Sequence, residues 1–112
     1  MTAQQLPELA ESLRQADPDR HQAAMTAAPE NRAKLLTLYA FNIEIARAAW
    51  VSSEPMINEI RLQWWRDALE EIGNGGNVRR HEVVTPLADV ISAEDAEVLD
   101  KLVMARRWDI YK

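Results

Sequence analysis

The chain has 112 residues, of which 47% are hydrophobic and 28% charged, and this length and balance are typical of one globular domain over residues 1–112. Its net charge of −5 argues against a nucleic-acid partner, because binding to a phosphate backbone depends on surplus Lys and Arg. The lack of cysteine excludes a disulfide framework, a thiolate metal site and a cysteine nucleophile.

The sequence also argues against membrane insertion and secretion. It contains no run of about 18 apolar residues, and its start lacks the basic stretch followed by an apolar stretch that marks a secretory signal. We therefore expect a cytoplasmic protein without a transmembrane segment. Peripheral association with a membrane surface stays open.

Helical spacing of apolar residues predicts helices over residues 2–16, 18–27 and 29–50. Asp17 followed by Pro18 has the residue types of a helix cap and a first helical turn. The third helix is apolar on nearly all sides, which favours a place inside a bundle of several helices. Its main buried stripe is expected to consist of Leu35, Leu38, Tyr39, Asn42, Ala46 and Ala49.

A second long helix is predicted over residues 55–72, where a Gly-Asn-Gly-Gly run ends it. Ser53 is expected to cap this helix, and Arg66 is expected to pair with Glu70 one turn later. The apolar face is expected to consist of Ile57, Ile60, Trp64, Trp65, Ala68, Leu69 and Ile72.

The last third of the sequence is also helical in pattern. A loop over residues 77–84, with a solvated basic run at residues 79–81, precedes a short helix that begins at Thr85-Pro86. Ser92 and Asp95 have the residue types of a capping box for a last helix that reaches residue 111. No strand pattern and no internal repeat occurs. The predicted fold class is therefore all-α, a helical bundle.

The common catalytic and metal-binding templates are missing from the sequence. His21 and His81 lie far apart and form no HExxH pair, and the glycine run lacks the lysine of a phosphate-binding loop. Glu70 and Glu71 are adjacent, so they point about 100° apart on a helix and do not converge on one ion. The residues alone indicate a helical domain with no catalytic set, no metal ligands and no bound cofactor.

Several segments together resemble the N-terminal portion of the squalene/phytoene synthase family. They are Leu-Tyr-Ala-Phe-Asn at residues 38–42, Glu-Ile-Ala-Arg at 44–47, Ser-Glu-Pro-Met-Ile at 53–57 and Glu-Ile-Arg-Leu-Gln-Trp-Trp-Arg-Asp-Ala-Leu at 59–69. Asp-Pro-Asp-Arg at 17–20 and Ala-Arg-Arg-Trp-Asp-Ile-Tyr at 105–111 fit the same family pattern. The resemblance covers nearly the whole chain. It implies the all-α isoprenoid-synthase-type fold, of which this chain would be the N-terminal portion, because family domains are well over twice as long.

Active members of that family are transferases that join two prenyl diphosphates head to head, and aspartates hold the Mg²⁺ ions that neutralise the leaving diphosphate. When the chain is aligned on the Tyr-Ala-Phe segment at residues 39–41, the first aspartate-rich motif should fall at Ala46, Arg47 and Trp50. None of these residues is a carboxylate. The resemblance therefore transfers no catalytic residue and no metal ligand to this chain.

The pattern Ala-Phe-Asn, Glu-x-Ala, Ser-Glu and Arg-x-Gln-Trp-Trp, together with the missing aspartates, resembles the family branch that includes the mitochondrial respiratory complex I assembly factor and its bacterial relatives. In that branch the fold is kept and the motif is eroded. This resemblance favours a non-catalytic factor that binds a prenyl lipid or a partner protein. The alternative is a prenyl-diphosphate transferase of isoprenoid biosynthesis, acting on farnesyl or geranylgeranyl groups with Mg²⁺ held by ligands outside this chain. A helical interaction module without a ligand is the third hypothesis.

Under the first two hypotheses, four residues are expected to contact a prenyl diphosphate or another isoprenoid lipid: Tyr39, Phe41, Asn42 and Arg61. Asn42 has a simpler interpretation as a core side chain with a hydrogen-bond partner. Arg61 is likewise best interpreted as a surface or ion-pairing cation. The alternative is a contact with the diphosphate, because the two-pronged guanidinium group matches phosphate oxygens.

Overall fold

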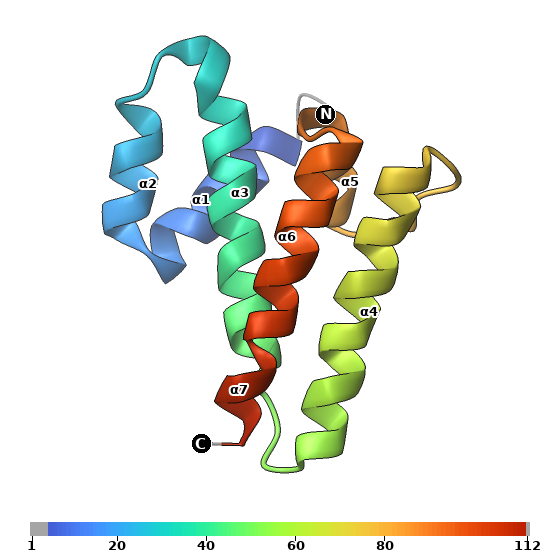
Figure 1. Cartoon of the computed structure of the whole chain (residues 1–112). Helices are drawn as coiled ribbons and strands as arrows, with labels where there is room; N and C mark the ends of the chain where they lie inside the picture. Colours follow the sequence, from blue (N-terminus) through green and yellow to red (C-terminus); the bar gives the residue numbers. More distant parts are fainter. Residues whose placement is uncertain (1–4, 112) are drawn as a thin grey trace. The chain divides into compact units, whose positions relative to one another are not determined.

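A computed structural model of the chain describes residues 5–111, and all regular secondary structure in that range is helical (Figure 1). The all-α prediction is therefore confirmed. In chain order the elements are α1 (Gln5–Ala16), α2 (Pro18–Met25), α3 (Pro29–Ala48), α4 (Pro55–Asn74), α5 (Val84–Val90), α6 (Ala93–Ala105) and α7 (Arg107–Ile110). No helix in the described range is both long enough and apolar enough to cross a membrane.

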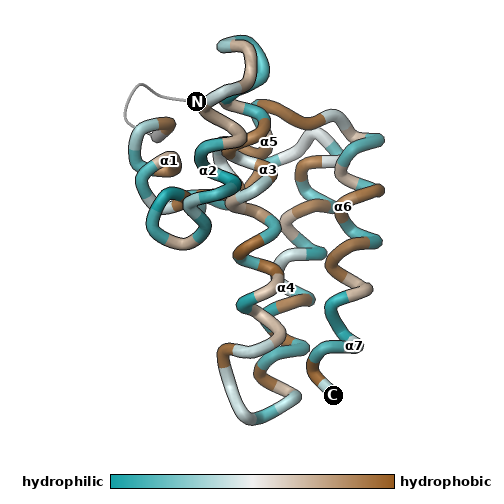
Figure 2. Tube along the Cα trace, turned by 90° about the vertical axis from the view of Figure 1, so that its left-hand side faces the viewer, coloured by the Kyte–Doolittle hydropathy of each residue, from teal (hydrophilic) through white to brown (hydrophobic). Residues whose placement is uncertain are grey.

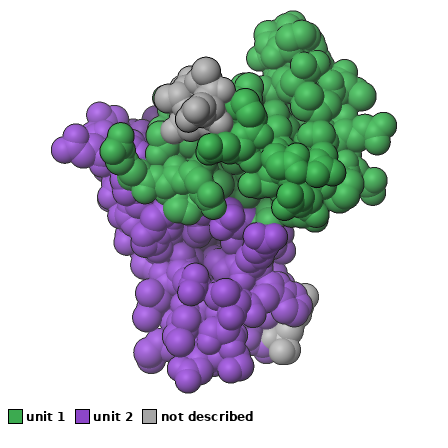
Figure 3. Space-filling view, turned by 180° about the vertical axis from the view of Figure 1, so that it is seen from behind, with its two compact units in different colours: residues 1–43, 80–91 green, residues 44–79, 92–112 purple. Residues whose placement is uncertain are grey.

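The chain divides into two compact units (Figure 3). Unit 1 comprises the chain up to residue 43 together with residues 80–91, and unit 2 comprises residues 44–79 together with the chain from residue 92. In unit 1, α1 packs against α2. In unit 2, α4 packs against α6, and α7 contacts both. Hydrophobic and hydrophilic residues alternate along α4 and α6 at helical spacing (Figure 2).

Local capping chemistry starts and ends several of these helices. Asp17 caps α2, because its Oδ1 accepts from the backbone N–H of Arg20 at 3.1 Å. Ser92 and Asp95 form the predicted capping box of α6, with two reciprocal hydrogen bonds of 3.1 Å each. At the end of α4, Gly75 has a φ of 67°, the left-handed conformation that glycine adopts at helix ends. The first two predicted boundaries are confirmed, whereas α4 extends to Asn74, two residues past its predicted end at residue 72.

Other boundaries differ from the prediction. The predicted start of the first helix at residue 2 is not among them, because residues 2–4 lie outside the described range, and within that range α1 spans Gln5–Ala16. The residue that caps α4 is Glu54, not Ser53, and the backbone N–H of Glu54 donates to the Ser52 hydroxyl at 3.0 Å. The predicted last helix is broken at Arg106, whose N–H donates three residues back to the Val103 carbonyl at 3.1 Å. This tighter turn ends α6 and separates it from α7.

The buried face of α4 differs from the predicted one by about one residue of rotation. Ile57 and Ile60 were expected in the core, and they are 39% and 63% exposed. The buried positions are Asn58, Leu62, Trp65, Ala68 and Leu69. Asn58 explains the difference: its Oδ1 accepts from the Ser52 N–H at 3.0 Å, and its Nδ2 donates to the Ser52 carbonyl at 2.8 Å. A polar side chain with both hydrogen-bond partners can be buried, but a prediction based on the spacing of apolar residues does not include it in the core.

The predicted stripe of α3 is also corrected. Leu35, Leu38 and Tyr39 are only half-buried. The buried side chains of the helix and its last turn are Leu36, Thr37, Ala40, Phe41, Ile45, Ala48 and Ala49. The helix is apolar on nearly all sides, so its pattern could not select one face. Thr37 is buried at no polar cost, because its hydroxyl donates to the Ala33 carbonyl at 2.8 Å.

Candidate functional site

The three positions of the first aspartate-rich motif lie at the end of α3, in unit 2. The helix ends at Ala48, and the carbonyl of Arg47 accepts both the Trp50 and the Val51 N–H at 2.9 Å. Position 50 therefore lies in a turn beyond the helix, where the regular spacing that puts residues one turn apart on one face no longer applies. The Trp50 side chain is 68% exposed, Arg47 is exposed and Ala46 is half-buried.

The residues at these positions do not fit a magnesium site. Mg²⁺ requires oxygen ligands, and a methyl group, a guanidinium and an indole supply none. Glu44, the acid that precedes them, lies two positions before the expected first ligand. Across residues 5–111, no three His, Asp or Glu side chains are grouped in a way that could hold a metal ion.

The predicted ligand-contact residues are divided between the two units. Tyr39, Phe41 and Asn42 lie on α3 in unit 1, where Phe41 is buried and the other two are half-buried. The guanidinium carbon of Arg20 lies 5.8 Å from the centroid of the Tyr39 ring, a cation–π distance. Arg61 lies on α4 in unit 2 and is exposed. Their role in ligand binding stays a prediction.

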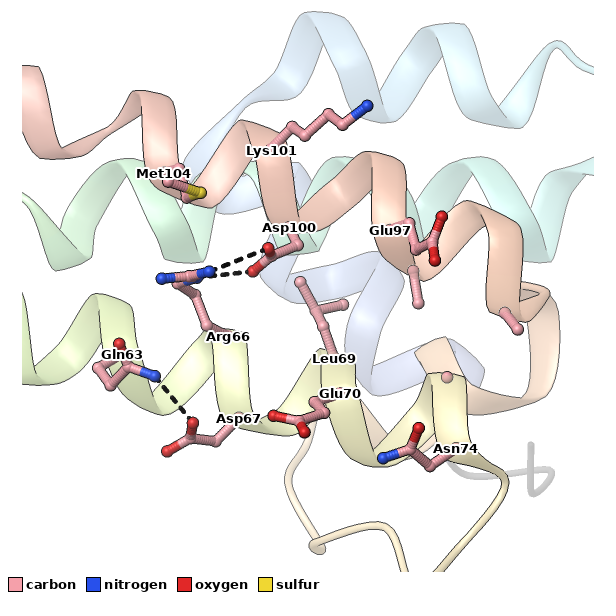
Figure 4. A pocket seen from close by; sticks show the side chains of 13 residues that line it. Gln63, Arg66, Asp67, Leu69, Glu70, Asn74, Glu97, Asp100, Lys101 and Met104 are labelled. Atoms are coloured by element: carbon pink, nitrogen blue, oxygen red, sulfur yellow. Dashed lines mark hydrogen bonds and ion pairs between the residues drawn. The ribbon is translucent and has the colours of Figure 1, made fainter.

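Unit 2 itself contains a groove between α4 and α6, with a volume of about 590 Å³ (Figure 4). Arg66 of α4 spans it and donates to both carboxylate oxygens of Asp100 on α6, with Nε–Oδ1 at 2.9 Å and Nη2–Oδ2 at 3.3 Å. This pairing replaces the predicted one between Arg66 and Glu70. The hydrogen bonds to Asp100 raise the pKa of Arg66.

The charged side chains that line this groove are mostly acidic. Four carboxylates (Asp67, Glu70, Glu97 and Asp100) face two cations, Arg66 and Lys101. Since Arg66 is paired with Asp100, the remaining carboxylates give the rim an excess of negative charge. Leu69, Ala96 and Met104 supply apolar surface between the charges.

A second hollow of about 320 Å³ continues along the same two helices towards α7. It shares Gln63 and Arg66 with the groove, so the two hollows are contiguous. Arg107 donates to Glu59 Oε1 from Nε at 3.0 Å and from Nη2 at 2.6 Å. Hydrogen bonds from Arg107, and then from Tyr111, lower the pKa of Glu59. The remaining lining is largely apolar, with Met56, Ile60, Leu62 and Val103.

The segment after α4 is fixed by a cluster around Arg79. Its Nε and Nη2 donate to the two oxygens of Glu71 at 2.9 and 2.8 Å, and its Nη1 donates to the Trp64 carbonyl at 3.4 Å. The guanidinium lies 4.9 Å from the Trp64 ring centroid. The hydrogen bonds from the Arg79 side chain lower the pKa of Glu71 to about 2.

The prediction that the basic side chains at residues 79–81 are solvated is therefore wrong for Arg79 and His81. Arg79 is held by Glu71, as described above. His81 Nδ1 accepts from the backbone N–H groups of Val83 and Val84 at 3.0 and 3.3 Å, which satisfies donors at the start of α5.

Sequence reasoning could not find the groove, because its two walls are separated in the chain. Arg66 and Asp100 are 34 residues apart, and neither belongs to a motif that would pair them. The available signal was weaker: both helices carry acidic residues next to a narrow apolar stripe.

Comparison with known proteins gives one match at the level of a family. The family model for squalene/phytoene synthase matches residues 13–112 of the chain. No curated protein and no solved structure matches it. The family match agrees with the sequence segments described above, and it does not distinguish the branches of the family.

Proposed function

Because the chain belongs to the squalene/phytoene synthase family, we propose that it is a non-catalytic member, which uses the family fold for binding and assembly and not for prenyl transfer. The observation that carries this proposal is the replacement of all three expected metal ligands by Ala46, Arg47 and Trp50. Active members need Mg²⁺ to neutralise the leaving diphosphate, and these three side chains cannot coordinate it.

The local structure supports the same conclusion. Trp50 follows the end of α3 and exposes most of its indole, and Arg47 adds positive charge where the family places metal ligands. With no carboxylate at any of the three positions, this motif could not hold Mg²⁺.

A partner protein is the ligand that the described surface of unit 2 favours. A prenyl chain is bound best in an enclosed apolar cavity, whereas the α4–α6 groove is open and has a charged rim. Unit 2 also exposes large apolar side chains, as protein interfaces do. They include Trp50, Val51, Met56, Ile60, Trp108 and Tyr111. The proposed role is thus that of an assembly factor, of the kind implied by the complex I branch.

Binding of Mn²⁺, a paramagnetic substitute for Mg²⁺, tests the non-catalytic role. The measurement is the electron paramagnetic resonance signal of free Mn²⁺ during titration with the protein, with and without farnesyl diphosphate. We expect the protein alone to bind no stoichiometric Mn²⁺. With farnesyl diphosphate present, we expect no more bound Mn²⁺ than farnesyl diphosphate binds without the protein. A protein site of micromolar affinity would overturn the proposal.

The matched variant carries Ala46→Asp, Arg47→Asp and Trp50→Asp. Two of these positions are exposed and one is half-buried, so the fold should tolerate the changes. If the variant gains Mn²⁺ affinity that the unmodified chain lacks, the missing carboxylates account for the missing site. A separate measurement tests whether a prenyl lipid is the ligand. If the protein does not bind farnesyl diphosphate in the absence of metal, a prenyl diphosphate is excluded as its ligand.

A further inference from the structure

We propose that the α4–α6 groove of unit 2 docks one amphipathic helix of a partner protein, with Lys or Arg at one end of that helix and apolar side chains at the other. The inference rests on the proposed binding role and names the partner's chemistry. Helix-in-groove recognition needs a long hollow with an apolar floor and a rim that selects the partner's charge. Unit 2 has each of these features.

The length of the hollow fits a helix. The two contiguous hollows extend along α4 from Met56 to Gly73, roughly 25 Å at 1.5 Å per residue. Their floor includes Leu62 and Val103 at one end and Leu69 and Ala96 at the other. A partner helix of about four to five turns would cover this distance.

The charge of the groove selects the partner's basic end. Glu70 and Glu97 are exposed on opposite walls, from α4 and α6, and Asp67 lies one turn before Glu70 (Figure 4). Asp100 is already neutralised by Arg66, so Asp67, Glu70 and Glu97 face one remaining lining cation, Lys101, and the excess is negative. Lysine or arginine side chains along both flanks of a helix would meet these carboxylates, and an acidic partner would be repelled.

The opposite end of the groove selects apolar side chains. Met56 and Ile60 are one turn apart on α4 and are 73% and 63% exposed. The charges near them are already matched, because Glu59 is paired with Arg107. This end is therefore apolar without a net charge, and covering it with leucine-like side chains would remove apolar surface from water.

The same distribution argues against a second copy of this chain as the occupant. The chain carries a net charge of −5, so two copies of it repel each other. A basic helix from another protein avoids that repulsion. The uneven charge also sets the direction in which the partner helix lies.

The test uses a fluorescein-labelled 18-residue helical peptide with a leucine stripe and with lysines flanking the stripe in one half only. Its dissociation constant for the 112-residue chain is measured by fluorescence anisotropy at 0.15 M salt. The groove variant carries Asp67→Asn, Glu70→Gln and Glu97→Gln. The control variant carries Glu8→Gln, Glu30→Gln and Glu82→Gln, which changes the net charge equally at exposed carboxylates of unit 1.

We expect saturable binding that weakens about tenfold in the groove variant and less than twofold in the control variant. Met56→Gln with Ile60→Gln should weaken it by a similar factor without changing charge. Equal loss in the two charge variants would overturn the inference, since the binding would then be non-specific attraction. So would equal binding of a peptide with glutamates in place of lysines.

Three further outcomes overturn the inference in favour of another occupant or none. The first is a concentration-dependent dimer that the groove variant abolishes. The second is displacement of the peptide by farnesyl diphosphate. The third is saturable peptide binding with amide shifts that lie outside α4, α6 and α7 in an NMR titration. The Mn²⁺ titration on the same preparation shows separately whether the non-catalytic role fails, so the two failures are distinguishable. Far-ultraviolet circular dichroism confirms that each variant remains helical.

Discussion

Arg66 on α4 and Asp100 on α6 join the two main helices of unit 2 through two parallel hydrogen bonds, with Nε–Oδ1 at 2.9 Å and Nη2–Oδ2 at 3.3 Å. Their side chains are 34% and 30% exposed, so solvent weakens the attraction without removing it. The bidentate geometry is the form in which an arginine–carboxylate pair contributes most. The pair thus crosses the proposed docking groove and ties its walls together.

A double-mutant cycle should detect this pair. We expect Arg66→Ala and Asp100→Ala to show a coupling energy of about 0.5–1 kcal/mol in the free energy of unfolding, measured by urea denaturation. Addition of salt should reduce the coupling, because partly exposed charges are screened. Strictly additive single-mutant effects would mean that the pair does not connect the helices in solution.

The ion pair between Glu71 and Arg79 predicts a pH-dependent stability. The pKa of Glu71 is about 2 in the folded protein, whereas an unfolded glutamate has a pKa of about 4.3. Folding therefore favours the ionised carboxylate. Its contribution is fully present above the unfolded pKa and is lost as the pH falls towards the folded pKa.

The measurement compares the unmodified chain with Glu71→Gln in urea between pH 7 and pH 2. The difference between their unfolding midpoints should stay constant from pH 7 to about pH 5 and should disappear towards pH 2. Glu70→Gln is the matched control, because it removes a neighbouring carboxylate without touching the Arg79 ion pair. A difference that grows on acidification would contradict the assignment.

Asn58 holds the turn before α4 through its two hydrogen bonds to the Ser52 backbone. Asn58→Ala should lower the free energy of unfolding by about 1–3 kcal/mol, because a backbone N–H and a carbonyl lose their partner. Asn58→Asp should not rescue it, since a carboxylate cannot donate to the Ser52 carbonyl. Thermal or urea unfolding, with Asn77→Ala at an exposed position as control, checks the effect.

Two leucines of unit 2 test the corrected core. Leu62 is 2% exposed on α4, and Leu102 is 48% exposed on α6. Leu62→Ala should cost about 2–5 kcal/mol of unfolding free energy, because it leaves a cavity. Leu102→Ala should cost under about 1 kcal/mol. Similar costs for both substitutions would place the core on another face of these helices.

The sequence was informative where structure depends on neighbouring residues. Asp17, the Ser92–Asp95 box and Gly75 act within one helical turn, so their effect can be read from a few adjacent residues. The buried faces of α3 and α4 depend on packing partners that lie far away in the chain. Rotation by one residue moves Ile60 out of the core and Asn58 into it, and periodicity does not resolve so small a difference.

Part of the candidate site could be predicted from the sequence, and part depends on the packing of distant segments. The absence of carboxylates at Ala46, Arg47 and Trp50 is a property of the sequence, and the structure adds that the helix ends before the last of these positions. The groove is a property of two helices together. Asp100 carries no motif, and only its position opposite Arg66 gives it a role.

A non-catalytic family member should not release diphosphate from prenyl substrates. The measurement is diphosphate release from farnesyl and geranylgeranyl diphosphate by this protein, with Mg²⁺ and with EDTA. A catalytically active family transferase serves as the positive control. We expect no release above the EDTA control from a folded protein. Mg²⁺-dependent release would contradict it, and would mean that ligands other than residues 46, 47 and 50 hold the metal.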